Sequence, residues 1–147
     1  MVRDFVASDQ QELRSLILAG LQERWGDAFD ARFNPDLDDF VASYLDGGAE
    51  IVVVEADGVL VATGTLLHDD RGDVGQIVRM SVAETHRRQG LGRSVVTELL
   101  ARARRRGVSE VRVLTDTPWM SAVELYRSCG FTEVGRDETD THFALRL

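Results

Sequence analysis

The chain has 147 residues, 44% of them hydrophobic, and is long enough to bury a continuous core as one domain spanning residues 1–147. It contains no apolar run long enough to span a membrane and no signal-peptide pattern at its N-terminus, so we expect a cytoplasmic protein with no membrane partner. One cysteine and three scattered histidines argue against disulfides and metal sites, and the formal net charge of −8 argues against a nucleic-acid partner.

The first fifty residues predict one strand and two helices. Residues 2–6 have the apolar content of a short strand. Asp9 and Glu12 have the spacing of a capping box ahead of a helix whose leucine and isoleucine residues recur every three or four positions. A second helix is predicted from Pro35 to the glycine pair 47–48, because proline is favoured in the first turn of a helix and glycine after the last.

The remaining residues predict a sheet interrupted by two helices. Residues 50–56 and 59–67 flank Asp57–Gly58, a pair that accepts the positive φ of a tight hairpin turn. The other predicted elements are a strand at 76–82, a helix from Leu91 that ends at Gly107, a strand at 111–116, a helix capped by Thr117 and Pro118 and ended by Gly130, and strands at 131–136 and 141–147. This order predicts the class α/β (α+β), with a mixed central sheet of six to seven strands flanked by about four helices.

Two glycines, Gly90 and Gly92, stand at the start of the helix that begins near Leu91. The first N–H groups of a helix are unpaired and its dipole is positive at that end, so an anion is favoured there. Glycines at these positions let an anion approach the N–H groups, and Arg87, Arg88 and Arg93 add positive charge. Equally, the glycines could serve a tight turn and the arginines a solvated surface.

Two common phosphate-binding motifs do not fit this stretch. A dinucleotide-binding loop needs a third glycine at position 95, where the chain has valine, and it directly follows its strand. A P-loop needs a lysine, and the sequence contains none. A plain nucleotide-binding domain therefore remains only a rival interpretation.

The segment VRMSVAETHRRQGLGRSVVTELL, together with AVELYRSCGF, resembles the GNAT superfamily of acyl-CoA-dependent N-acyltransferases. Arg87 to Gly92 match that family's R/Q-x-x-G-x-G/A signature, and the resemblance covers about residues 76–131. It implies a GNAT fold, acetyl-CoA as cosubstrate, and homodimers as a possible state.

The resemblance also implies roles for individual residues. The pantetheine arm would lie along Met80, Ser81 and Val82, and the pyrophosphate would bind the loop of Arg87, Arg88, Gln89, Gly90, Leu91, Gly92 and Arg93. In this family the strand usually bulges and separates from its neighbour, so that an N–H near Val82 can stabilise the oxyanion. Tyr126 would lie near the thioester sulfur and protonate the leaving thiolate.

Three positions depart from the family pattern or stay open. Where members often have an asparagine that contacts pantetheine, this chain has Trp119, so either that contact is lost or the indole packs on the cofactor. Where the histone-acetylating branch has a glutamate base, it has Gln76. Asp116 is the candidate general base, ahead of Glu84 and His68. An acid with only a structural role, in a loop or at a helix cap, would give the same sequence pattern.

The predicted function is transfer of an acetyl group from acetyl-CoA to a primary amine by direct attack. Residues 1–75 carry 16 acidic side chains and 5 arginines, whereas residues 76–147 carry 9 and 12. The acidic half favours a cationic acceptor, which could be a small amine, a protein N-terminus or a lysine. The alternative from another class is a non-catalytic acyl-CoA-binding module.

Overall fold

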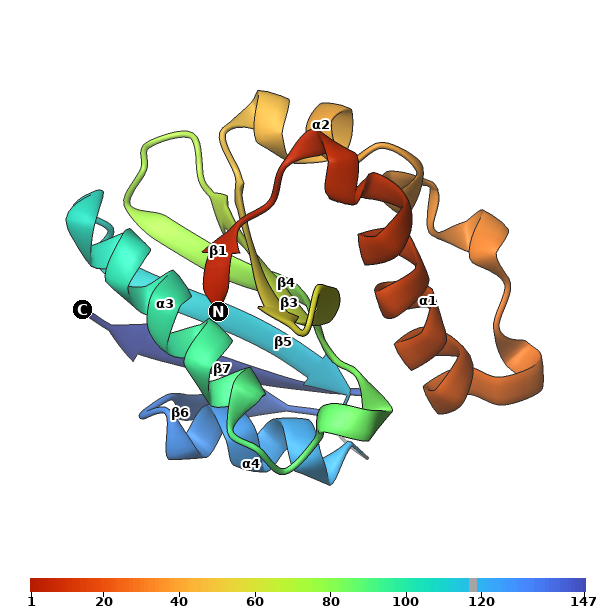
Figure 1. Cartoon of the computed structure of the whole chain (residues 1–147). Coiled ribbons are helices and arrows are strands. Elements are labelled where there is room, and N and C mark those ends of the chain that lie inside the picture. The colour runs from red at the N-terminus through yellow and green to blue at the C-terminus, as the bar shows by residue number, and fades with distance from the viewer. Residues whose placement is uncertain (117–118) are drawn as a thin grey trace.

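A seven-stranded mixed sheet forms the centre of the structure, a computed structural model that describes residues 1–116 and 119–147 (Figure 1). The strands are β1 (Val2–Asp4), β2 (Glu50–Ala56), β3 (Val59–His68), β4 (Val74–Val82), β5 (Glu110–Asp116), β6 (Thr132–Arg136) and β7 (Asp140–Arg146). They lie in the order β1-β2-β3-β4-β5-β7-β6, and neighbours are antiparallel except for β4 and β5, which are parallel. The predicted sheet of six to seven strands is confirmed.

Four α-helices accompany the sheet in the described part of the chain. They are α1 (Gln10–Trp25), α2 (Phe40–Ser43), α3 (Leu91–Arg105) and α4 (Met120–Ser128). In Figure 1, α3 and α1 lie well apart with β3 and β4 between them. None of these four helices has the length and apolar character needed to cross a bilayer.

The two faces of β2 show how the core is divided. Val52 and Val54 belong to the larger apolar cluster, which includes the inner face of α3, whereas Ile51 and Val53 belong to a second cluster with α1. Because successive side chains of a strand point to opposite faces, a strand with apolar residues at every position needs a covering layer on both sides. The continuous run of apolar residues in β2 therefore explains why α1 and α3 lie on opposite faces.

The hairpin predicted around Asp57 and Gly58 is confirmed. Asp57 has φ +52° and Gly58 has φ +78°, the values that a primed turn requires, and the turn joins β2 to β3 directly. The helix predicted from Leu91 is also confirmed, and Gly107 follows it with φ +78°.

The predicted continuous helix from Pro35 to Gly47 is wrong. The segment forms a 3-10 turn at Pro35–Asp38, the short α2, and another 3-10 turn at Leu45–Gly47. The break falls at Asp39, whose backbone is extended because its side chain accepts a hydrogen bond of 3.0 Å from Ala42 N–H and so caps a new helix. Local competition by an aspartate side chain outweighed the helical pattern.

The predicted capping box of Asp9 and Glu12 is also wrong. The Asp9 carboxylate accepts hydrogen bonds from Arg3 and from Val6 N–H, and Glu12 Oε2 accepts one of 2.7 Å from Leu60 N–H on β3. Glu12 therefore ties α1 to the sheet, and its partner lies 48 positions away in the sequence, beyond what a local motif can reveal.

The pairing of β4 with β3 contains a bulge. Thr63 pairs with Ser81 and Thr65 with Val78, so two residues of β4 lie opposite Gly64 alone. A β-carbon at Gly64 would lie 2.4 Å from Met80 Sδ and 2.6 Å from Val95 Cγ1, distances that real contacts do not reach. Glycine is therefore required opposite the bulge so that Met80 can pack against α3.

We predict that Gly64→Ala destabilises the fold by about 1–3 kcal/mol, because the added methyl overpacks this contact. Gly47→Ala is the matched control: Gly47 has no neighbour within 4 Å of an added β-carbon, and its φ is not positive. Its effect should stay within about 0.5 kcal/mol. Urea unfolding measures both changes, and equal midpoints for the two variants would contradict the packing argument.

Candidate active site

The parallel pairing of β4 and β5 is short, and the two strands separate beyond it. Their register runs from Val74 opposite Glu110 to Ile77 opposite Val113 and stops there. Beyond that point β5 stays paired with β7, while Val78–Val82 of β4 has no strand partner on its β5 side in the described structure. A gap therefore opens between β4 and β5, edged by backbone donors and acceptors.

The side chains of Met80 and Ser81 point to opposite faces of the sheet. Met80 packs into the α3 core beside Gly64, and Ser81 Oγ lies against Gly20 of α1, 3.0 Å from where a β-carbon would stand. N–H and C=O groups project in the plane of a sheet, so the backbone of Met80–Val82, rather than these two side chains, faces the gap. Packing on the two faces of the sheet therefore determines which side chains occupy positions 80 and 81.

The N-terminus of α3 follows this strand edge after a short loop. Gly90 precedes the helix with φ +76° and has no neighbour within 4 Å of an added β-carbon. The first hydrogen bond of the helix joins Ser94 N–H to Gly90 O at 3.0 Å. The N–H groups of Leu91, Gly92 and Arg93 precede this bond and have no acceptor within the helix, which is the arrangement that binds anions.

Gly92 has a packing role that the sequence analysis missed. A β-carbon there would lie 3.3 Å from Leu125 Cδ2 of α4 and 3.7 Å from Val82 Cγ2. Gly90 allows the left-handed turn, whereas Gly92 lets α4 approach the start of α3. The close approach of α4 brings Tyr126 toward the same end of the sheet.

The arginines of the loop differ in their surroundings. Arg88 and Gln89 are exposed, as is Arg93 in the first turn of α3. Arg87 instead pairs with Glu23 of α1 through two hydrogen bonds of 2.5 and 2.8 Å, and its Nε donates to Val82 O at 3.3 Å. The hydrogen bonds that Arg87 donates to Glu23 raise the pKa of Arg87, so this guanidinium is charged and already has an anionic partner.

Tyr126 lies inside the core, on the buried face of α4. Its side chain is buried, and the centre of its ring lies 5.8 Å from that of Phe131 and 6.0 Å from that of Phe143. Burial raises the pKa of its hydroxyl, Cys129 adds to the effect, and the positive charge of Arg24 opposes it. The phenol is therefore neutral at pH 7 and holds a proton that it could donate.

Arg24, in the last turn of α1, is a site residue that the sequence analysis missed. It forms an ion pair with Asp116 at the end of β5, and its guanidinium lies 3.7 Å from the centre of the Trp119 ring. Nη2 is the atom that faces Asp116, and burial lowers the pKa of the guanidinium. Nothing in the sequence distinguishes this arginine from one that merely complements a helix C-terminus.

The candidate base Asp116 is thus paired with a cation. The Arg24 guanidinium occupies this carboxylate, so an acceptor amine could reach it only after the ion pair opens. Trp119, which precedes α4, is 40% exposed and is covered by Arg24 on one side. The predicted capping residues of α4, Thr117 and Pro118, lie outside the described residues.

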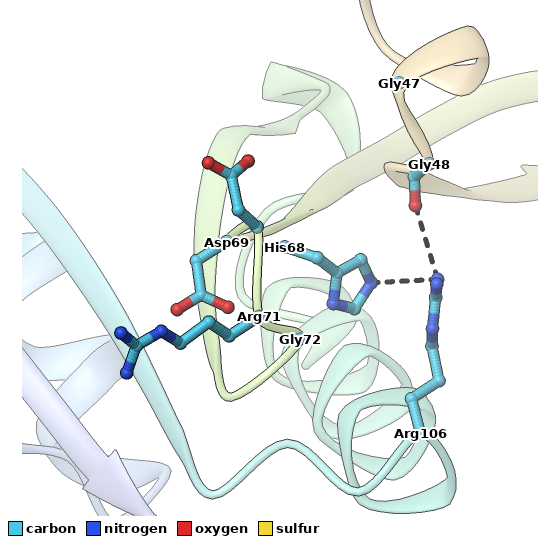
Figure 2. Close-up of a pocket in the computed structure, with 8 residues that line it drawn as sticks. Gly47, Gly48, His68, Asp69, Arg71, Gly72 and Arg106 are labelled. Carbon is cyan, nitrogen blue, oxygen red and sulfur yellow. Dashed lines mark hydrogen bonds between the residues drawn. The ribbon is translucent and has the colours of Figure 1, made fainter.

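A polar hollow of about 470 Å³ lies at the other end of β3 and β4 (Figure 2). Its lining includes His68, where Arg106 donates to Nε2 at 3.0 Å and also bonds Gly48 O at 3.3 Å. His68 pairs with Gly75 at the start of β4, about 16 Å along the strand from Met80. The weaker candidate base His68 is therefore remote from the gap, whereas Glu84 lies in an exposed turn just after β4.

Both tyrosines of the chain should titrate above the ordinary value of about 10. Burial raises the pKa of Tyr44, with the hydrogen bond to Asp36 as a second cause, and burial raises that of Tyr126. Absorbance at 295 nm should show no tyrosine ionising near pH 10 in the folded protein, and both ionising there in guanidinium.

The sign of the linkage follows from these raised values. The folded state keeps the phenol protons longer than the unfolded chain, so stability is complete below about pH 10 and falls as the pH rises further. A folded protein with one tyrosine ionising at its ordinary pKa would show that the corresponding ring is not buried as described. Tyr44→Phe and Tyr126→Phe assign the two transitions.

Comparison with known proteins gives a consistent result. The model of the Acetyltransferase (GNAT) family matches residues 11–131. Human N-acetyltransferase 8 is 35% identical over 117 residues, which are 76% of this chain and 52% of that protein, and its rat counterpart is 33% identical over 84% of this chain. The chain spans about half the length of these curated relatives.

Solved structures share the fold along the whole chain. A GNAT-family acetyltransferase from Staphylococcus aureus superimposes with a TM-score of 0.89 at 18% identity, and covers 100% of this chain and 98% of its own. An N-acetyltransferase of Thermoplasma acidophilum, solved with coenzyme A, gives 0.86 at 13% identity with the same coverage. Taken together with the family match over most of its length, these similarities show that the chain belongs to the GNAT superfamily of acetyltransferases.

Proposed function

We propose that residues 1–147 act as an acetyl-CoA-dependent N-acetyltransferase domain that transfers an acetyl group to a primary amine by direct attack. The main support for this proposal is that the unpaired edge of β4 leads, through one loop, to the open N-terminus of α3. An extended arm with amide groups fits the first feature and a pyrophosphate fits the second. The related structures from Thermoplasma acidophilum and Salmonella typhimurium contain coenzyme A and acetyl-CoA, respectively.

The pyrophosphate would bind the N–H groups at the start of α3, with Arg87, Arg88 and Arg93 around it. Because Glu23 holds Arg87 in the free protein, binding exchanges one anionic partner for another. The pantetheine arm would lie along the backbone of Met80–Val82, where Ser81 and Met80 keep their packing on either face. Trp119, which directly precedes α4 and has Arg24 over its ring, would flank the cofactor.

The chemistry follows from these positions. The neutral amine attacks the thioester carbonyl, and an N–H near Val82 stabilises the oxyanion. The C–S bond then breaks, Tyr126 gives its proton to the thiolate, and the amine nitrogen loses a proton to water or a base. Burial keeps Tyr126 protonated until that step, and the charge of Arg24 stabilises the phenolate that remains. Asp116 would serve as base only after separating from Arg24.

For the acceptor, we propose a small cationic amine. The acidic N-terminal half supplies α1 and the segment after it, which lie on the side of the gap facing away from α3. Solved structures with this fold include an aminoglycoside 6'-acetyltransferase and a ribosomal-protein-alanine N-acetyltransferase, so fold alone leaves small-molecule and protein acceptors both open. Profiling polyamines, amino acids and peptides under identical conditions tests this choice.

Tyr126→Phe should lower kcat by about 10²-fold or more, because the phenyl ring keeps the packing but has no proton to donate. The KM for acetyl-CoA and the melting temperature should change little. Unchanged turnover would rule out Tyr126 as the acid. If the wild type binds acetyl-CoA yet acetylates no amine in the panel, the domain is a binding module instead.

Gly90→Ala should raise the Kd for coenzyme A about tenfold, or ~1.4 kcal/mol, because a β-carbon strains the left-handed residue that aims the N–H groups. Gly72→Ala is its match: Gly72 has φ +73°, Gly90 has φ +76°, and neither has a neighbour within 4 Å of the added carbon. Gly72→Ala should lose similar stability and no affinity. Calorimetry with coenzyme A, NAD and ATP measures the binding; tighter binding of NAD or ATP would favour a plain nucleotide-binding domain.

A further inference from the structure

Arg79 holds an unusual backbone conformation inside β4. Three described residues other than glycine have positive φ: Asp57 in the hairpin turn, Arg88 in the loop before α3, and Arg79, the only one within a strand, at +53°. An arginine has no intrinsic preference for this region, where its β-carbon crowds the backbone. Its surroundings must therefore stabilise this conformation.

The guanidinium of Arg79 binds Asp36 through two hydrogen bonds along one edge. Nε donates to Asp36 Oδ2 at 3.0 Å and Nη2 donates to Oδ1 at 2.8 Å, while Nη2 also donates to Asn34 Oδ1 at 3.2 Å. This two-point geometry fixes the direction of the guanidinium as well as its distance. The side chains of both ion-pair partners are about three-quarters buried, so water screens the pair only in part.

Asp36 is itself held in place by the apolar core. Tyr44 donates a 2.5 Å hydrogen bond to Asp36 Oδ2, and its ring stacks on the buried Phe40 with centroids 6.4 Å apart. Gln10 of α1 fixes the intervening backbone by donating to Leu37 O and accepting from Phe40 N–H, both at 2.9 Å. Burial opposes ionisation of Asp36, but the hydrogen bonds from Arg79 and Tyr44 outweigh it and lower its pKa.

The conformation of Arg79 determines the bulge opposite Gly64. Arg79 and Met80 are the two residues that face the single residue Gly64, so the left-handed turn of Arg79 directs the strand that follows. That following stretch, Met80–Val82, is the edge that borders the gap. An error in the direction of this edge would displace every backbone group that a ligand arm could use.

We propose that the Asp36–Arg79 ion pair is a positioning device that holds the β4 bulge, and with it the backbone edge at Met80–Val82, in the geometry that receives the acyl-CoA arm. This role rests on the proposed function. Arg79 acts through the backbone rather than by contact with the reacting atoms, because its guanidinium is engaged by Asp36 and Asn34.

The two substitutions Arg79→Ala and Arg79→Gly separate a backbone role from a side-chain role. Both remove the guanidinium, but only glycine adopts the positive φ without a steric penalty. Arg79→Ala should lower kcat/KM for acetyl-CoA about tenfold, since small misplacements of bound groups are costly. Arg79→Gly should stay within about threefold of the wild type. Equal impairment of the two variants overturns the proposal.

Asp36→Ala tests the partner, and a neighbouring ion pair supplies the control. Asp38 pairs with Arg14 of α1 at 3.2 Å, and no hydrogen bond or ion pair among the described residues joins it to β4, so Asp38→Ala removes a more exposed ion pair from the same segment. Asp36→Ala should lower kcat/KM for acetyl-CoA about as much as Arg79→Ala does, whereas Asp38→Ala should leave kcat/KM near the wild-type value. In the Arg79→Gly background Asp36→Ala should add less than twofold, because coupled sites are not additive. Full additivity overturns the proposal.

Hydrogen exchange at residues 78–83 gives a readout that does not depend on turnover. Arg79→Ala and Asp36→Ala should exchange faster there than the wild type or Asp38→Ala, at equal melting temperatures or after correction for them. Unchanged exchange overturns the positioning role even if the wild type proves inactive. If exchange responds as expected while the wild type acetylates no amine, the proposed function fails and the link to the bulge stands.

Discussion

The site depends on one constraint: β4 can pair with β5 over only four residues. Beyond Ile77 and Val113 the bulge turns β4 away, and its backbone groups on that side lack a partner strand. Unpaired backbone donors and acceptors in the middle of a sheet are costly unless something else satisfies them. A ligand with its own amide groups could do so, and in the proposed function this defect in the pairing receives the acyl-CoA arm. The gap lies next to the N-terminus of α3, where the proposed function places the phosphates.

The two halves of the chain differ in charge, but part of this difference is used within the molecule. Glu23 pairs with Arg87, Asp36 with Arg79, and Asp4 with Arg102, each joining an acid of the first half to an arginine of the second. Arg24 and Asp116 make the same connection with the signs reversed. The pairs of Glu23, Arg24 and Asp36 connect α1 and its following segment to the elements around the gap, whereas the Asp4–Arg102 pair connects β1 to α3. The acidic half therefore helps to hold these elements together.

Several elements could be predicted because their signals are local. The apolar run of β2, the Asp57–Gly58 turn and the ladder of α3 each act within a few residues, and all three appear where expected. The prediction of one continuous helix from Pro35 to Gly47 failed because Asp39 caps a new helix. The capping preference of this aspartate outweighed the helical spacing of the apolar residues. The prediction for Glu12 failed for a different reason: its hydrogen-bond partner, Leu60, belongs to another element, β3.

By itself, the sequence determined the family, the order of the strands and helices after residue 50, and the position of the glycine turn before α3, since spacing and turn chemistry suffice for these. Only the tertiary structure determined which residues from other elements lie around these features. Arg24 reaches Asp116 and Trp119, Arg79 reaches Asp36, and Gly92 admits Leu125 only because the fold brings separate elements together. Short-range patterns determine which elements form, whereas the charge state, burial and direction of a site residue depend on neighbours distant in sequence, and those neighbours exist only in the folded chain.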